Sequence, residues 1–120
     1  MKAILVNDDQ SLRWDNVPDP VVGSEDCLVK IEYAAINRAD LMQREGDYPP
    51  PPGCPDWMGL EISGEIVEIG EEAKEKSDWK IGDKVCALLG GGGYAEYVNV
   101  KYDMLVPVPT NCTMAEAAAM

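Results

Sequence analysis

The sequence predicts a mainly β, barrel-like domain with one or two short helices. Three observations support this prediction. Short apolar segments recur along the chain and are separated by turns that contain glycine or proline. Only two segments carry the signals of a helix start. The 120 residues, of which 46% are hydrophobic, suffice for one compact domain with its own core.

The first strands are expected close to the N-terminus. Residues 2–6 (KAILV) predict a strand, and a polar turn follows them. Residues 17–22 predict an extended edge segment, because their two prolines cannot donate to a strand ladder. Residues 27–36 are the clearest strand, since apolar and charged side chains alternate there. The apolar face of that strand carries Val29, Ile31 and Tyr33.

Residues 38–45 predict a short helix. The Asn37 side chain can accept from the free amides of the first turn, and Asp40 lies where the helix dipole favours an acid. Gly46 is a natural C-terminal stop. Four consecutive prolines within residues 47–55 then fix an extended loop, which we interpret as a rigid connector.

The middle of the chain predicts further strands. Residues 61–69 form one, with Gly64 where the backbone bends or another strand comes close. Residues 71–78 are mostly charged and predict a solvated loop. The remaining strands are expected within residues 79–87, 94–100 and 104–108. Gly90 to Gly93 fit a flexible hairpin loop better than a phosphate-binding loop, because a strand pattern follows them.

The last residues predict the start of a helix. Thr113 and Glu116 have the spacing of a capping box. A helix that begins there has only a few residues before Met120 and is marginal unless it is packed. We therefore expect one domain at residues 1–112, and at residues 113–120 the start of a truncated helix that leads to a missing domain.

Charge, cysteine content and the lack of histidine exclude several functions. The 22 acidic and 10 basic residues give a net charge of −12, so neither nucleic acid nor an anionic membrane surface is an expected partner. No apolar run approaches the ~20 residues of a membrane span. Without a signal peptide or a CxxC pair, the four cysteines suggest reduced thiols in a cytoplasmic protein. The absence of histidine removes the usual general base and the commonest zinc ligand.

A series of motifs in family order covers nearly the whole chain. It comprises Asn37, Asp40, Arg44, Gly46, Tyr48, the prolines at 49–52, Gly59-Leu60-Glu61, Gly64, Gly82 to Val85, Gly93 to Tyr97, Pro107 to Pro109 and Ala115 to Ala119. Together these motifs resemble the zinc-independent quinone oxidoreductases of the zeta-crystallin type, in the medium-chain dehydrogenase/reductase superfamily. The resemblance implies their N-terminal catalytic domain, a GroES-like, partly open β-barrel. Their Rossmann domain is absent from this chain.

The resemblance also implies a metal-free reaction. The zinc-dependent alcohol dehydrogenases use a cysteine near the position of Asn37 and a histidine at the position of Leu60, so no zinc is expected here. The implied reaction transfers hydride or electrons from NADPH to a quinone or an enone, both small molecules. Most contacts to NADPH would come from the missing domain, so the fragment alone is expected to be inactive. The full-length protein is expected to be a homodimer.

Three residues are candidates for catalysis. By resemblance, Asn37 and Tyr48 lie near the nicotinamide and the substrate carbonyl, so they are also assigned to cofactor binding. Asp40 is the third catalytic candidate. Helix capping alone would explain Asn37 and Asp40, and packing on prolines would explain Tyr48. Met42 stands where many quinone oxidoreductases carry a second tyrosine, which leaves the substrate open.

Two alternatives to a quinone reductase remain. Enoyl reductases of the same superfamily share much of the pattern. A stand-alone GroES-like module could instead bind another protein through an exposed patch. A strand, GxGxxG and helix encoded directly downstream would favour the enzyme, whereas a stop codon would favour the module.

Overall fold

The computed structural model describes residues 1–45 and 57–119, and it is mainly β, as the sequence predicts. The predicted proline loop and the helix stop at Gly46 lie outside the described residues. The strands are β1 (Lys2–Val6), β2 (Leu12–Asn16), β3 (Asp26–Ala35), β4 (Glu61–Ile69), β5 (Lys84–Leu88), β6 (Tyr97–Lys101) and β7 (Leu105–Pro107). The helices are α1 (Arg38–Glu45), α2 (Glu71–Lys76), α3 (Met114–Ala118) and a 3-10 helix, η1 (Tyr102–Met104).

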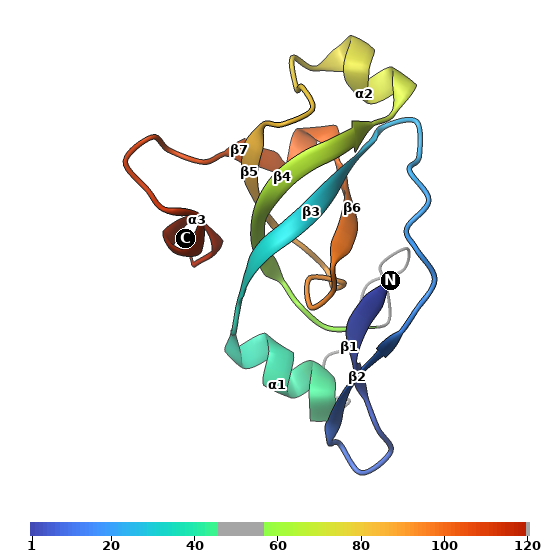
Figure 1. Cartoon of the computed structure of the whole chain (residues 1–120). Coiled ribbons are helices and arrows are strands. Elements are labelled where there is room, and N and C mark those ends of the chain that lie inside the picture. The colour runs from blue at the N-terminus through green and yellow to red at the C-terminus, as the bar shows by residue number, and fades with distance from the viewer. Residues whose placement is uncertain (46–56, 120) are drawn as a thin grey trace.

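The strands form two antiparallel sheets. A five-stranded sheet has the order β6-β3-β4-β5-β7, and β1 and β2 form a separate hairpin. A bridge between Ala3 and Ala95 joins the hairpin to the segment before β6. In Figure 1, α2 lies at one end of the long strands β3 and β4, while α1 and the hairpin lie at the other end. The arrangement is the partly open β-barrel that the family resemblance implies.

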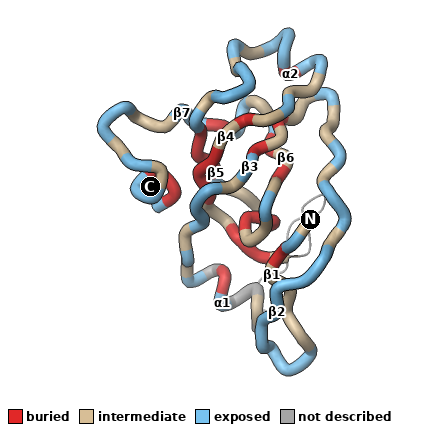
Figure 2. The backbone as a smooth tube through the Cα atoms, viewed as in Figure 1, coloured by how far each residue is buried: buried red, intermediate tan, exposed pale blue. Residues whose placement is uncertain are grey.

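The hydrophobic core lies within the curved sheet, and Figure 2 shows the buried residues gathered along its strands. Burial of each large aliphatic side chain stabilises the fold by roughly 1.5–3 kcal/mol. The core residues are Cys27, Val29, Ile62, Ile66, Ala73, Val85, Ala87, Val98, Val100 and Leu105. The close backbone approach predicted at Gly64 is confirmed, because a Cβ there would lie 2.2 Å from the Lys30 carbonyl oxygen.

Two segments predicted as turn or loop contain regular secondary structure. The expected polar turn after β1 contains strand β2, whose five side chains are all exposed. The expected charged loop after β4 contains helix α2. Glu71 and Glu72 lie in its first turn and Lys74 and Lys76 in its last, as the helix dipole favours, and Ala73 anchors it in the core.

The predicted apolar face of β3 holds only in its first half. Val29 is buried and Ile31 packs against the core, but Tyr33 is 50% exposed. The pairing of β3 with β4 shifts register between Ile31 and Tyr33. A bulge of this kind breaks the alternation of faces, and accordingly Glu32 and Tyr33 line the same surface groove beside α3.

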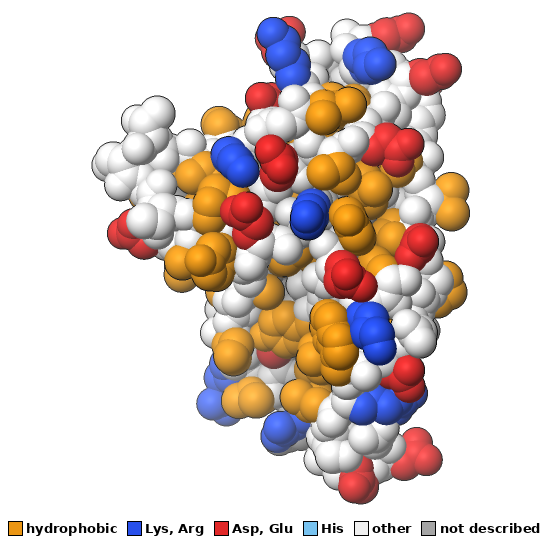
Figure 3. All heavy atoms as spheres, in the orientation of Figure 1, with side chains coloured by type: hydrophobic (Ala, Val, Ile, Leu, Met, Phe, Trp, Pro, Cys, Tyr) orange, Lys and Arg blue, Asp and Glu red, His pale blue; other side chains and the backbone are white. Residues whose placement is uncertain are grey.

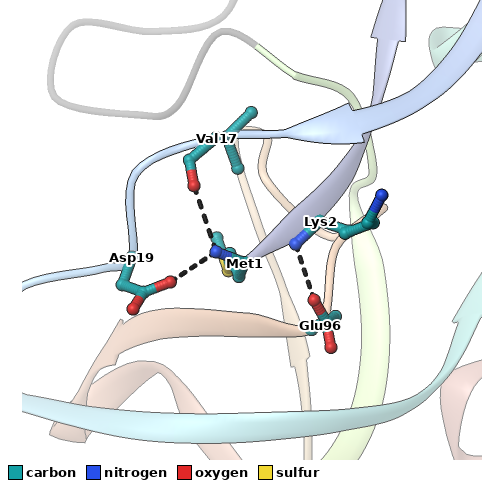
Figure 4. A network of polar contacts seen from close by, with 5 residues as sticks. All are labelled: Met1, Lys2, Val17, Asp19 and Glu96. Carbon is teal, nitrogen blue, oxygen red and sulfur yellow. Dashed lines mark hydrogen bonds and ion pairs between the residues drawn. The ribbon is translucent and has the colours of Figure 1, made fainter.

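Polar contacts fix the start of β1. The amino group of Met1 donates to the Val17 carbonyl oxygen at 3.1 Å and to Asp19 Oδ1 at 2.5 Å (Figure 4). The backbone N–H of Lys2 donates to Glu96 Oε1 at 2.6 Å. These bonds hold β1 between the segment after β2 and the segment before β6. None of the helices within residues 1–45 and 57–119 is long and apolar enough to cross a membrane.

Helix α3 begins with the predicted capping box. The Glu116 N–H donates to Thr113 Oγ1 at 3.1 Å, and the Thr113 N–H donates to Glu116 Oε1 at 3.0 Å. The helix packs on the sheet, where Ser63 Oγ donates to the Met114 carbonyl oxygen at 2.5 Å. The predicted helix start at Thr113 is therefore confirmed.

Candidate active site

A largely apolar pocket of about 400 Å³ lies where β3 ends and α1 begins. The β1–β2 hairpin and the segment before β4 complete its walls. Figure 3 shows hydrophobic side chains gathered over this end of the molecule. The described lining residues are Ile4, Leu12, Ala34, Ile36, Asp40, Leu41, Arg44, Met58 and Tyr94. The pocket therefore combines an apolar wall with a few polar groups, as small-molecule sites do.

Asp40 is the buried acid of this pocket, with only 3% of its surface exposed. Its Oδ2 accepts the Asn37 N–H at 2.8 Å and the Tyr94 hydroxyl at 2.5 Å. Its Oδ1 is buried and has no hydrogen-bond partner among the described residues. Two donors and the N-terminus of α1 thus compensate for the burial of this carboxylate.

Asn37 directly precedes α1, and the structure brings it together with Asp40 as the sequence predicts. The detail of the cap differs from the prediction. Among the described residues no first-turn amide donates to the Asn37 side chain; instead the Asp40 carboxylate accepts the Asn37 N–H, the reverse half of a capping box. Nδ2 of Asn37 is buried without a partner, so its capacity to donate is unused.

Tyr94 joins three parts of the site. Its hydroxyl lies 2.5 Å from Asp40 Oδ2 and 3.1 Å from the Ala35 carbonyl oxygen. Its backbone oxygen accepts from the N–H of Ile4 at 2.8 Å. Burial, followed by the hydrogen bond to Asp40, raises the pKa of Tyr94 well above its ordinary value. The hydroxyl therefore stays protonated and serves as a donor at neutral pH.

The glycine run before Tyr94 places that residue in the site. Gly91 to Gly93 are buried, and this backbone crosses the segment before β4, so the expected flexible hairpin loop was wrong. The N–H of Gly93 donates to the Gly59 carbonyl oxygen at 3.1 Å, and that of Tyr94 to the Met58 carbonyl oxygen at 2.9 Å. A Cβ on Gly59 would lie 2.4 Å from the Tyr94 nitrogen, so only glycine permits this crossing.

The sequence analysis assigned no functional role to two of the pocket residues. Arg44 and Tyr94 both belong to the motifs that carry the resemblance, but a local pattern cannot show that they reach one pocket with Asp40. For Arg44 the signal was its position one turn after Asp40 on the same helix. For Tyr94 it was only the motif from Gly93 to Tyr97. The third predicted site residue, Tyr48, lies outside the described residues.

In the part of the chain that the structure describes, no three or more cysteine, aspartate or glutamate side chains gather as metal ligands do. Cys27, Cys86 and Cys112 are free thiols. Leu60, at the position of a zinc ligand in the metal enzymes, has no donor atom in its side chain. The expected lack of zinc stays a prediction.

Comparison with known proteins identifies the family. Residues 23–110 match the alcohol dehydrogenase GroES-like domain, and the chain belongs to this family. This match confirms the resemblance to the medium-chain dehydrogenase/reductases and the GroES-like fold that the resemblance implies.

The relatives include both quinone oxidoreductases and enoyl reductases. A chloroplastic quinone-oxidoreductase homolog of Spinacia oleracea is 37% identical over 87% of this chain and 32% of its own length. The trans-enoyl reductase ffsC of Aspergillus flavipes is 34% identical over 88% of this chain and 30% of its own length. The chain thus spans about a third of the length of these relatives.

A solved structure agrees with this assignment. The quinone oxidoreductase of Thermus thermophilus, which was also solved in complex with NADPH, aligns with a TM-score of 0.77 and 28% identity. The alignment covers 100% of this chain and 36% of that protein.

Proposed function

We propose that this chain is the catalytic domain of an NADPH-dependent, metal-free reductase of quinones or enones. The observation that carries the proposal is the pocket at the N-terminus of α1, where an apolar wall meets Asp40 and Tyr94. Asn37 lies directly before the helix and is bound to Asp40 through its backbone N–H. The family match supports an oxidoreductase, and the relatives include quinone oxidoreductases and enoyl reductases. We assign the catalytic domain to residues 1–112 and the start of a connecting helix to residues 113–120.

One side-chain group, the Asn37 amide, fits a nicotinamide cofactor. The buried Nδ2 of Asn37 has no partner among the described residues, so it is free to donate to an amide or carbonyl oxygen of the cofactor. We assign Asn37 and Tyr48 to the cofactor and the substrate carbonyl. NADPH supplies the hydride when it is bound.

The chain's own residues act by positioning. The apolar wall of the pocket fits a flat ring or an unsaturated chain. Asp40 fixes the backbone of Asn37 through their hydrogen bond at 2.8 Å, so that the Asn37 amide is held at the head of the helix. Little more is needed for a quinone, because its reduction yields an aromatic product.

The test uses the polypeptide encoded by the complete reading frame that contains these 120 residues. We expect NADPH oxidation that depends on 9,10-phenanthrenequinone or on an enoyl thioester, and the preferred acceptor decides between the two substrate classes. Asn37→Ala should lower kcat by about 10- to 100-fold. Asn16→Ala, an exposed asparagine at the end of β2, is the matched control and should change nothing.

Tyr48→Phe tests the second assigned residue and should lower kcat/KM without unfolding the protein. If the complete polypeptide folds but neither binds nor oxidises NADPH, the reductase proposal fails. A protein-binding module would then be the leading alternative.

A further inference from the structure

Arg44 is the only cation among the described residues that line the pocket. Its Nε is buried without a hydrogen-bond partner. No ion pair joins its guanidinium to a carboxylate within residues 1–45 and 57–119. By contrast, Arg13 pairs with Asp15 at 3.4 Å on the exposed hairpin. Arg44 is therefore a half-buried charge whose partner is missing from the described structure.

The natural partner for Arg44 would be Asp40, one helical turn earlier. Asp40 is instead held by the Asn37 N–H and the Tyr94 hydroxyl at its Oδ2. These donors and the positive end of the α1 dipole offset the negative charge of Asp40. The same helix thus presents to the pocket a compensated acid in its first turn and an uncompensated base in its last turn.

An unpaired guanidinium beside an apolar wall favours one kind of ligand. Arginine stays charged, and its planar fork of donors matches a carboxylate. The guanidinium makes no ion pair with a described residue, so its two Nη atoms can donate to a ligand. Apolar surroundings strengthen the attraction to an anion. Most of the other side chains that line the pocket are apolar, among them Ile4, Leu12, Ile36 and Met58.

We propose that Arg44 makes this pocket selective for substrates that join an apolar, unsaturated body to one carboxylate group. The inference rests on the proposed function, because it takes this pocket to be the substrate site. It deepens that function by naming a substrate class, the carboxylated quinones and enones. Arg44 is the residue that determines this specificity, and it takes no part in hydride transfer.

The test compares two probes of the same shape, trans-cinnamate and trans-cinnamamide, which differ in charge. Titration calorimetry on the complete polypeptide, without NADPH, measures both affinities. We expect trans-cinnamate to bind about tenfold more tightly, as a charge-assisted hydrogen bond predicts. Arg44→Met should abolish that preference, and Arg44→Lys, which keeps the charge but loses the fork, should retain part of it. Arg38→Met, at an exposed arginine of the same helix, should leave it unchanged.

Several results would overturn the inference. They are equal affinity for the two probes, no binding of either probe, and a preference for trans-cinnamate that survives in Arg44→Met. Circular dichroism checks that each variant is folded. If Arg44→Met does not fold, the comparison of wild type with Arg44→Lys still tests the inference. Turnover of 9,10-phenanthrenequinone without a carboxylate preference would refute this inference alone. A carboxylate preference without turnover would refute the proposed function alone.

Discussion

The hydroxyl of Tyr94 lies 2.5 Å from Oδ2 of Asp40, although the two residues are 54 positions apart in the sequence. The bond joins the segment before β6 to helix α1 across the pocket. Asp40 is 3% exposed, so it depends on the donors around it. The head of α1, and with it Asn37, is therefore held in place by a residue from a distant part of the chain.

Tyr94→Phe should destabilise the domain by about 1–3 kcal/mol, because it removes one of two donors from a buried carboxylate. Urea denaturation followed by tryptophan fluorescence measures the change. Tyr97→Phe, whose hydroxyl has no such bond, is the matched control and should stay within about 0.5 kcal/mol of the wild type. Equal stability of Tyr94→Phe and the wild type would show that the bond contributes nothing.

Tyr94 should also give the domain a specific sensitivity to alkali. The folded-state pKa of Tyr94 is raised by burial and by Asp40 above its ordinary value of 10.0. A raised pKa favours the protonated form in the folded state, so its contribution to stability is complete below about pH 10. That contribution is lost as the pH rises towards the folded-state pKa, because the unfolded chain releases this proton first.

The measurement is a pH titration of tyrosinate absorbance, combined with circular dichroism. In the wild type one tyrosine should ionise only together with unfolding. In Tyr94→Phe this step should vanish, and stability above pH ~10 should depend less on pH. Ionisation of all tyrosines before any loss of structure would contradict the prediction.

How far the sequence predicted the fold depended on whether a signal was local. Strand β1, helix α1 and strand β4 have the predicted bounds, because their apolar periodicity or capping residues lie within the element itself. Strand β2 carries only a short alternation, Leu12 and Trp14, on side chains that are all exposed, and it is ordered by pairing with β1, with Trp14 opposite Ile4. Helix α2 was missed because its charged residues outweigh the single anchor, Ala73.

For the candidate site, too, the sequence predicted only what a local pattern could show. Asn37 and Asp40 are three residues apart at a helix start, so the sequence could place them together. The link from Asp40 to Tyr94 requires the backbone crossing of Gly59 and Gly93, which no local pattern reveals. Similarly, the spacing of Asp40 and Arg44 on α1 would favour an ion pair, but among the described residues they form none.

The backbone crossing gives a third prediction. Gly59 and Gly82 both have positive φ, at 115° and 98°, but only Gly59 lies against other backbone. Gly59→Ala should therefore destabilise the domain by about 3 kcal/mol or more, because both strain and a clash with Tyr94 oppose the new Cβ. A Cβ on Gly82 would meet only the Glu65 side chain, at 4.0 Å, so Gly82→Ala should cost only about 1–2 kcal/mol from strain.

Urea denaturation of the two variants measures the difference. Gly59→Ala should also change the chemical shifts of Asp40 and its neighbours, because the backbone crossing positions Tyr94 beside Asp40. Gly82→Ala should leave those shifts alone. Similar losses of stability in the two variants would mean that the crossing is loose and does not position Tyr94.

The capping box of α3 gives a fourth prediction. Thr113→Ala should weaken this helix by about 1 kcal/mol, because it leaves the Glu116 N–H without its side-chain acceptor. Hydrogen exchange at Ala117 and Ala118 should become faster. Thr110→Ala, an exposed threonine three residues before the cap, is the matched control and should have no effect.

The same box should make α3 sensitive to acid. The hydrogen bond from the Thr113 N–H lowers the pKa of Glu116 below its ordinary value of 4.5. A lowered folded-state pKa means that the contribution is present above about pH 4.5 and lost as the pH falls through the folded-state value. Carboxyl NMR shifts of Glu116 should therefore titrate below pH ~4.5 in the wild type and closer to it in Thr113→Ala. Identical titrations would show that the box is open in solution, and the fixed start of α3 would then depend on the bond from Ser63 to Met114.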